Sequence, residues 1–466
     1  MQQFFAILKD SFREAVDGFV IYVMLALAAV LIVLVASVSF TPDSPDVALP
    51  KVLPKFAILY PDQGKGTFPT AVPVPLKYQA ANAQLGANGA ATFILEVDRD
   101  KERDGALALP LDGFRYAVYT WTKPSGPKVE NPFANRNRGP NVSTELGIVA
   151  PPAASADDLK GVTDEQMVAF LKFQFAAFVG VHESDVTISR RAGVAEPAYA
   201  FDVQLNNATT ARGWTQSVSV LFGAVPPFKS RPLGASVAFI QDQLVNGIGA
   251  AVTLMLSVVI TAFFIPNMLR KGSLDLLISK PIGRVQLLVY KYIGGLTFIF
   301  LLSAFTIGGV WAVTGVRSGL WNPTFLLVVP VLTFTFAILY AVSTVIAVYT
   351  RSAIAAILIT LAFMFFLYLL GQAKTVFDAN RIVNEFDLPE WAYTLVDTLN
   401  NILPRYKDLD KLTTSFITDG TVPVGDARIR GIFVETPSWA GAFGVSLAFI
   451  ALMLGLASWR LVKRDG

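Results

Sequence analysis

The chain of 466 residues has no cysteine and a single histidine, His182. The absence of cysteine excludes a disulfide, a thiol nucleophile and a cysteine-ligated metal site, and it leaves the redox compartment undetermined. His182 stands near Glu183 and Asp185, but one histidine cannot supply the two or three imidazole ligands of an ordinary zinc site. We therefore expect a surface turn at His182, and no metal site.

Charged residues are also scarce. They make up 16% of the chain, whereas hydrophobic residues make up 53%, and the mean hydropathy is +0.52. Such a chain is too apolar for a soluble globule and too long for a single membrane span. The sequence therefore predicts a multi-pass membrane protein, and its small net charge of +3 gives no indication of a nucleic-acid partner.

Apolar runs long enough to cross a bilayer recur along the chain. We expect six transmembrane helices, at 19–40, 241–264, 285–313, 323–349, 353–371 and 439–459, with five or seven as the alternatives. Residues 1–18 are typical of an amphipathic helix that lies along the cytoplasmic interface, and the first run is too long for a signal peptide. The cations of the short link at Arg351 and of the tail 460–466 predict that both termini are cytoplasmic.

Two polar stretches lie between these runs on the predicted outer side. Residues 41–236, between the first and second spans, are expected to form an extracytoplasmic α+β domain, with a capping box of Thr163 and Gln166 opening a helix over Thr163–Val179. Alternating or apolar runs predict its strands, at Phe56–Tyr60, Ala91–Val97, Phe114–Thr122, Val186–Ser189, Ala198–Leu205 and Trp214–Leu221. The stretch 372–436 is expected outside too, with helices around Ala373–Phe386 and Trp391–Leu403. The predicted fold class is a membrane all-α bundle with an inserted α+β domain.

Two further absences bear on function. No phosphate-binding Gly-x-x-x-x-Gly-Lys-Ser/Thr loop occurs; Gly64-Lys-Gly-Thr67 lacks its first glycine and falls in the outer domain. The predicted spans carry almost no ionisable residue away from their ends, although proton-coupled carriers keep such residues at membrane depth. The sequence therefore disfavours a proton-coupled carrier and suits a path for apolar or lipid-like cargo, or a machine that only transmits force.

One short basic segment, residues 265–284, separates two of the apolar runs. Its cations outnumber its single anion, Asp275, which places it on the cytoplasmic side. The cations are Arg270, Lys271, Lys280 and Arg284.

The same segment predicts a short amphipathic helix. Ser273, after Gly272, is a suitable N-cap, and Leu274, Leu277 and Ile278 are spaced to form one apolar face. Pro281 ends the helix, because proline lacks a backbone donor and disfavours helix at the preceding residue.

This segment resembles the intracellular loop of permease subunits of type-2 ABC transporters, the ABC-2 membrane family. The loop of that family runs roughly Gly-Ser/Thr-Leu-Asp/Glu-Leu-Leu-Leu-Ser-Lys-Pro-x-Ser-Arg. The matching residues are Gly272, Leu274, Asp275, Ser279, Lys280, Pro281 and Arg284, and Lys291 follows. The chain departs from the pattern at Ile265–Met268, where Pro266 and Asn267 replace an expected Gly-Glu pair. The branch most similar to it includes the permeases for copper-enzyme maturation of nitrous oxide reductase.

The resemblance implies a permease subunit of the bacterial inner membrane, not itself an enzyme, that works as a homodimer or heterodimer. A separate cytoplasmic ABC ATPase would bind ATP and Mg, so this chain would need no cofactor. The resemblance implies that the ATPase-coupling residues are Arg270, Lys271, Gly272, Ser273, Leu274, Asp275, Leu277, Ser279, Lys280, Pro281 and Arg284. Membrane lipids and an extracytoplasmic protein are the other expected partners.

Two other functions stay open on the sequence alone. One is an ABC-type mechanotransmitter, in which the outer domain regulates an envelope partner and nothing crosses the bilayer; the large insertion after the first span motivates it. The other is a membrane-anchored receptor or enzyme without an ATPase. The count of spans separates the first from a permease, and a neighbouring ATPase gene would argue against the second.

Overall fold

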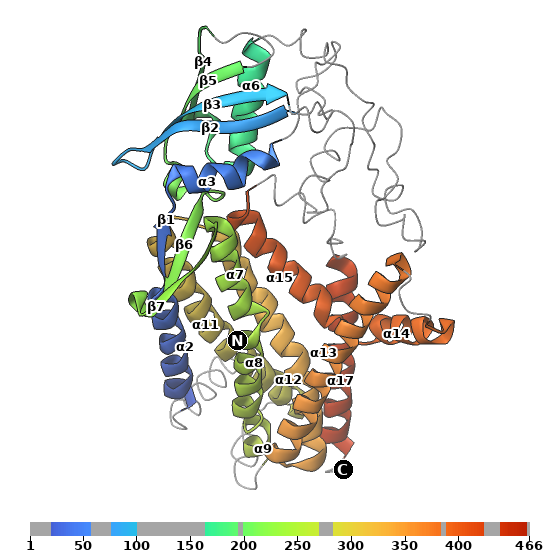
Figure 1. The fold of residues 1–466 in the computed structure, drawn as a ribbon. Helices are drawn as coiled ribbons and strands as arrows, with labels where there is room; N and C mark the ends of the chain where they lie inside the picture. Colours follow the sequence, from blue (N-terminus) through green and yellow to red (C-terminus); the bar gives the residue numbers. More distant parts are fainter. Residues whose placement is uncertain are drawn as a thin grey trace.

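A computed structural model describes residues 20–56, 76–99, 164–193, 199–269, 283–383, 388–423 and 439–463. These residues form a bundle of long helices with two antiparallel β-sheets at one end (Figure 1). The predicted interfacial helix 1–18, most of the coupling segment and the predicted strand Phe114–Thr122 lie outside the described residues. Of the predicted strand Phe56–Tyr60 only Phe56 is described, and it follows a short 3-10 turn, Leu53–Lys55.

Apolar helices of spanning length build the bundle. The principal ones are α11 (Arg284–Ser318), α12 (Val328–Thr350), α13 (Ala353–Val383) and α17 (Trp439–Lys463). The described residues contain five stretches long and apolar enough to cross a membrane, the other one being Ala251–Met268. The prediction of a multi-pass helical bundle is thus confirmed, whereas the number six is not.

The predicted first span, 19–40, is shorter in the structure. Its helix, α2 (Val20–Ala36), ends at Ala36, and strand β1 (Ser39–Pro42) begins three residues later. The predicted end at Phe40 is wrong because Phe40 pairs with Val218 of strand β6 (Thr215–Val220). An apolar run cannot by itself distinguish the end of a helix from the start of a strand.

The predicted second span, 241–264, is interrupted in the structure. Helix α7 (Leu233–Val245) ends at Asn246, and α8 (Ile248–Thr261) follows Gly247. A second break separates α8 from α9 (Phe264–Met268). Pro266 explains this break, because the N–H that it lacks would have bonded to the carbonyl of Ala262, four residues earlier.

The stretch after the fifth span is more helical than predicted. Helix α13 continues without interruption from Ala353 to Val383, so the expected boundary near residue 371 has no break in the backbone. Helix α14 (Glu390–Ile402) corresponds to the helix predicted around Trp391–Leu403. Helix α15 (Tyr406–Thr421) was not predicted. Its polar, threonine-rich sequence resembles a loop, and it is stabilised by packing against the bundle.

The larger sheet has the strand order β2-β3-β5-β4; we call it the upper sheet. Strands β3 (Ala91–Arg99), β4 (Val186–Arg190) and β5 (Tyr199–Leu205) coincide with predicted strands, whereas β2 (Leu76–Leu85) was not predicted. Helices α3 (Pro45–Val52) and α6 (Asp164–Gln174, continued by a π turn to Val179) pack on its apolar face. Their shared core includes Leu49, Leu95, Leu171, Phe175 and Phe201, all almost fully buried.

The smaller sheet, β1-β6-β7, joins the upper sheet to the bundle; we call it the stalk sheet. Strand β1 continues from α2, and β7 (Val225–Pro232) leads directly into α7. Asp43, directly after β1, links the strands of the stalk sheet. Its carboxylate accepts hydrogen bonds from Thr215 Oγ1 at 2.8 Å and Ser230 Oγ at 2.9 Å. Its backbone carbonyl accepts a hydrogen bond from Trp214 Nε1 at 3.1 Å. The stalk sheet therefore connects two helices of the bundle to the upper sheet.

Glycines allow α11 to approach its neighbours closely. A Cβ atom at Gly295 would lie 2.7 Å from the Tyr340 ring of α12, and one at Gly309 would lie 2.4 Å from Ile32 of α2. The Tyr340 ring also stacks on Tyr292, at 5.1 Å between ring centres. Small residues permit such approach between helices in membranes, so α2 and α12 both pack closely against α11.

Candidate functional site

The residues that flank the predicted coupling segment lie at the end of the bundle opposite the sheets (Figure 1). Of the coupling residues predicted from the sequence, the structure describes only Arg284, the first residue of α11, which is half-buried. The other ten, from Arg270 to Pro281, fall outside the described residues. The two flanks are described, as α9 with Leu269 on one side and Gly283 with α11 on the other. The structure therefore describes the two flanks of the segment, and not the segment itself.

Both flanks pack into one apolar cluster, which we call the basal cluster. Ile265 and Met268 of α9 and Leu287 and Leu288 of α11 belong to it and are almost fully buried. The other helices contribute Ala347 and Val348 from α12, Ala356 from α13, and Ala457 and Leu461 from α17. Because close-packed interiors transmit displacement, a force on either flank reaches all of these helices.

Pro266 and Asn267, the departure from the family pattern, lie inside α9. Pro266 is buried and Asn267 is half-buried. Proline is tolerated in the first turn of a helix, where its missing N–H leaves no intrahelical bond unmade. A short helix, α9, thus occupies the position directly before the coupling segment.

Lys291 is a cation in the interior of α11 that the predicted site did not include. Its residue is 3% exposed, and it lies two turns after the helix begins at Arg284. Buried lysines are rare and are retained for a partner or a function. The signal was present in the sequence, since Lys291 is the first charge inside the apolar run after Arg284.

The end of the bundle opposite the sheets carries further cations, and we call it the basic end. These cations are Arg284, Arg351, Arg460 and Lys463. The Arg460 guanidinium lies 5.2 Å from the centre of the Tyr349 ring, and Lys463 Nζ lies 4.9 Å from that of Trp459. Arg351 caps the end of α12 in a left-handed conformation. Cations concentrated at one end of a bundle indicate the side that faces the cytoplasm.

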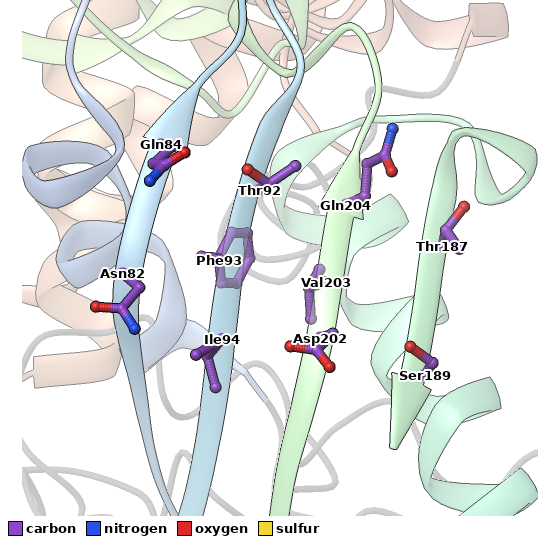
Figure 2. A pocket seen from close by; sticks show the side chains of 10 residues that line it. All are labelled: Asn82, Gln84, Thr92, Phe93, Ile94, Thr187, Ser189, Asp202, Val203 and Gln204. Carbon is purple, nitrogen blue, oxygen red and sulfur yellow. The ribbon is translucent and has the colours of Figure 1, made fainter. Parts of the chain in front are cut away.

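The upper sheet presents a polar face away from its core. Figure 2 shows a shallow cavity of about 340 Å³ on this face, lined by side chains of all four strands. The polar lining residues are Asn82, Gln84, Thr92, Thr187, Ser189, Asp202 and Gln204. The alternation that buries Phe93 and Val203 on one face turns polar neighbours to the other, so this face has the ordinary composition of a solvated sheet.

His182 lies in a turn of the same region. Its Nδ1 accepts a hydrogen bond from the Ser184 N–H at 3.3 Å and so caps the short turn Glu183–Asp185. Among the residues that the structure describes, no group of three His, Cys, Asp or Glu side chains is placed to hold a metal ion.

Comparison with known proteins identifies the family. Searches of curated proteins and of solved structures find no match. The family model described as "ABC-2 family transporter protein" matches residues 78–466, which include most of β2, the strands β3–β7, the basic segment and all five candidate spans. The resemblance seen in the basic segment is thereby confirmed at family level, and this multi-pass membrane protein belongs to the ABC-2 transporter family.

Proposed function

We propose that this chain is the permease subunit of an ABC transporter and that a separate cytoplasmic ATPase drives it through the segment 265–284. Members of the ABC-2 family generally work with such an ATPase and as dimers. The observation that carries the proposal is the basal cluster, because both ends of the coupling segment are anchored in it. The order of residues in the segment favours the branch of copper-enzyme maturation permeases.

In this mechanism the basic end faces the cytoplasm and the sheets lie outside. Gly272–Ser279 forms the docking helix, with Leu274 and Leu277 on its apolar face and Lys280 and Arg284 binding acidic groups of the ATPase or lipid phosphates. Nucleotide binding closes the ATPase pair and displaces the segment. The displacement passes into α9 and α11, and the basal cluster distributes it to α12, α13 and α17.

The test is ATPase copurification. A triple variant, Leu274→Ala with Asp275→Ala and Lys280→Ala, removes the apolar face, the anion and a cation of the docking helix together. We expect the tagged variant to insert into host membranes as the parent does but to lose its ATPase in a mild-detergent pull-down. The matched control is Lys463→Ala, an exposed cation at the same end but outside the segment. Copurification of the ATPase with the triple variant would refute the docking role.

A second function, force transmission to an envelope partner without transport, is favoured by the continuity of the stalk sheet. Strand β7 runs into α7, which leads through Asn246–Gly247 to α8 and α9, so one chain path joins the upper sheet to the coupling segment. Force transmission without transport predicts that the reconstituted complex hydrolyses ATP but moves no lipid-like probe across the bilayer. ATP-driven movement of the probe would refute this function.

A further inference from the structure

The turn between β6 and β7, residues 221–224, lies directly against the end of α2; we call it the hairpin tip. The Leu221 N–H donates to Ser37 Oγ at 3.2 Å, and the Phe222 N–H donates to the Ser37 carbonyl at 2.9 Å. Ser37 is the first residue after α2. The hairpin therefore points from the sheets toward the bundle and stops where the apolar helix stops (Figure 1).

The same level marks the end of a membrane span. Arg317, in the last turn of α11, donates from Nε to the Val38 carbonyl at 2.9 Å and from Nη2 to Ser39 Oγ at 2.6 Å. The candidate span Arg284–Ser318 ends one residue later. Since Ser37 and Val38 are adjacent, the hairpin tip lies at the edge of the apolar zone of the bundle.

Large apolar side chains of this hairpin are exposed. Leu221 is 50% exposed, Phe222 71% and Phe228 58%. Beneath them, Val30 and Val33 of α2 are 66% and 60% exposed. Ser37 follows Val33 by four residues and so stands on the same face of the helix. The exposed apolar surface of the tip thus continues the flank of α2.

The backbone conformation of the hairpin tip is unfavourable for Leu221 and Phe222. Leu221 and Phe222 both have positive φ values, 54° and 56°, a conformation that favours Asn or Gly in a two-residue hairpin turn. Packing within the protein leaves half of Leu221 and most of Phe222 exposed. A surface outside the chain accounts for the presence of two large apolar residues there.

The charges on the hairpin indicate what that surface is. Residues 215–232 contain Lys229 and Arg231 and no acidic residue, and both cations are exposed. The Arg231 guanidinium also lies 6.0 Å from the centre of the exposed Phe239 ring. Apolar residues at the tip with cations a few residues above them match the layers of a bilayer, acyl chains below and phosphates above.

We propose that the hairpin tip inserts into the lipid leaflet at the sheet end and anchors the stalk sheet to the membrane. Leu221 and Phe222 enter the acyl region beside α2, and Phe228 lies at the interface. Lys229 and Arg231 extend along the strand to bind headgroup phosphates, so anionic phospholipids strengthen the contact. The anchor fixes one edge of the stalk sheet, and β7 transmits any movement of the upper sheet into α7.

A spin label measures this directly, because the chain has no native cysteine to remove. The full chain is labelled at Phe222→Cys in nanodiscs of phosphatidylethanolamine and phosphatidylglycerol, and its collisions with oxygen and with a water-soluble nickel chelate are compared. Leu34→Cys, on the exposed flank of α2, supplies the value for lipid, and Ala87→Cys, at the exposed turn between β2 and β3, supplies the value for water. We expect Phe222→Cys to match Leu34→Cys, with collisions with the nickel chelate nearly lost.

Two results would overturn the proposal. A label at position 222 that collides with the nickel chelate as often as the label at position 87 would show that the tip is in water. A label shielded from both reagents would show that protein, such as a second copy of this chain, covers the tip. The same measurement at Phe222→Cys, which keeps both cations, should change when phosphatidylglycerol is replaced by phosphatidylcholine, and no change would refute the role of the cations.

Discussion

The surroundings of Asp410, in α15, disfavour the ionised form of its carboxyl group. Burial raises its pKa to about 7, with the Lys407 cation opposing the rise and the Asp242 anion adding to it. Asp242 itself accepts hydrogen bonds from Asn246 Nδ2 at 2.9 Å and from Thr414 Oγ1 at 3.0 Å. The Asp242 anion therefore acts on Asp410 across the contact between α7 and α15.

The raised pKa of Asp410 predicts that stability falls as pH rises. In the unfolded chain the group ionises near 3.8, whereas in the folded chain it stays neutral up to about pH 7. The contribution of Asp410 to the free energy of unfolding is therefore greatest below about pH 4 and falls as the pH rises to about 7. The total loss is at most about 4 kcal/mol, and partial solvent access reduces it.

Asp410→Asn tests this effect. The neutral amide cannot ionise, so the variant should unfold at a higher temperature than the parent at pH 8 and at a similar temperature just below about pH 4. Thermal unfolding followed by tryptophan fluorescence at the two pH values measures the difference. The control is Asp419→Asn, an exposed carboxyl of the same helix. If Asp410→Asn shows the same change between the two pH values as the parent, Asp410 does not carry the dependence.

At the scale of elements, α15 packs against several helices at the sheet end of the bundle and so stabilises that end. It contacts α7, α12 and α13 and the short 3-10 turn η9 (Pro323–Leu327) before α12. Asn322 makes the link to η9: its Nδ2 donates to the carbonyls of Phe416 and Ile417, each at 3.2 Å. Thr324 Oγ1 donates to the Phe416 carbonyl at 2.8 Å. Asn322 is 1% exposed, so these bonds are shielded from water.

Asn322→Ala should weaken the contact between α15 and η9 and so lower the stability of the chain. Removing the amide leaves two buried carbonyls without this donor, which costs about 1–3 kcal/mol. Asn322→Asp should cost more, because it places a negative charge next to the same carbonyls. The midpoint of thermal unfolding of the detergent-solubilised chain orders the variants. Asn401→Ala, at an exposed position of α14, should have almost no effect, and an equal loss in all three variants would contradict the proposed link.

A network of ion pairs holds α14 to the extension of α13. Lys374 Nζ lies 2.5 Å from Asp378 Oδ1 and 3.0 Å from Asp397 Oδ1, and Arg381 Nη2 lies 2.5 Å from Asp397 Oδ2. The hydrogen bond from Arg381 lowers the pKa of Asp397. These cations therefore have anionic partners on neighbouring turns and helices, which offset their positive charge at the sheet end of the bundle.

At the scale of the molecule, the proposed topology assigns each end of the bundle to one side of the membrane. Single cysteines at Ala87, Thr398 and Lys463, all exposed, report on the upper sheet, α14 and the end of α17. In intact cells a membrane-impermeant maleimide should label positions 87 and 398 and should reach 463 only after the membrane is opened. Labelling of 463 in intact cells, or protection of 87, would reverse the orientation.

Local patterns in the sequence accounted for much of this molecule. Long apolar runs located α11, α12, α13 and α17, since the lack of water in a bilayer requires backbone groups to bond within a helix. Alternation located β3, β4 and β5, because one face of the upper sheet is buried. The basic segment identified the family through the order of its residues, and the described flanks place it between α9 and α11.

Other features depended on contacts between distant residues. Strand β1 exists because Phe40 meets Val218, and α15 packs where it does because Asn322 and α7 contact it. The breaks at Asn246–Gly247 and before Pro266 divide a single apolar run into three helices.

The sequence by itself determined a multi-pass ABC-2 membrane protein, because hydropathy and motif order are properties of neighbouring residues. Only the tertiary structure decided where the hairpin tip lies. Leu221 and Ser37 are 184 residues apart in the chain, and no local pattern records that they meet at the edge of the membrane zone.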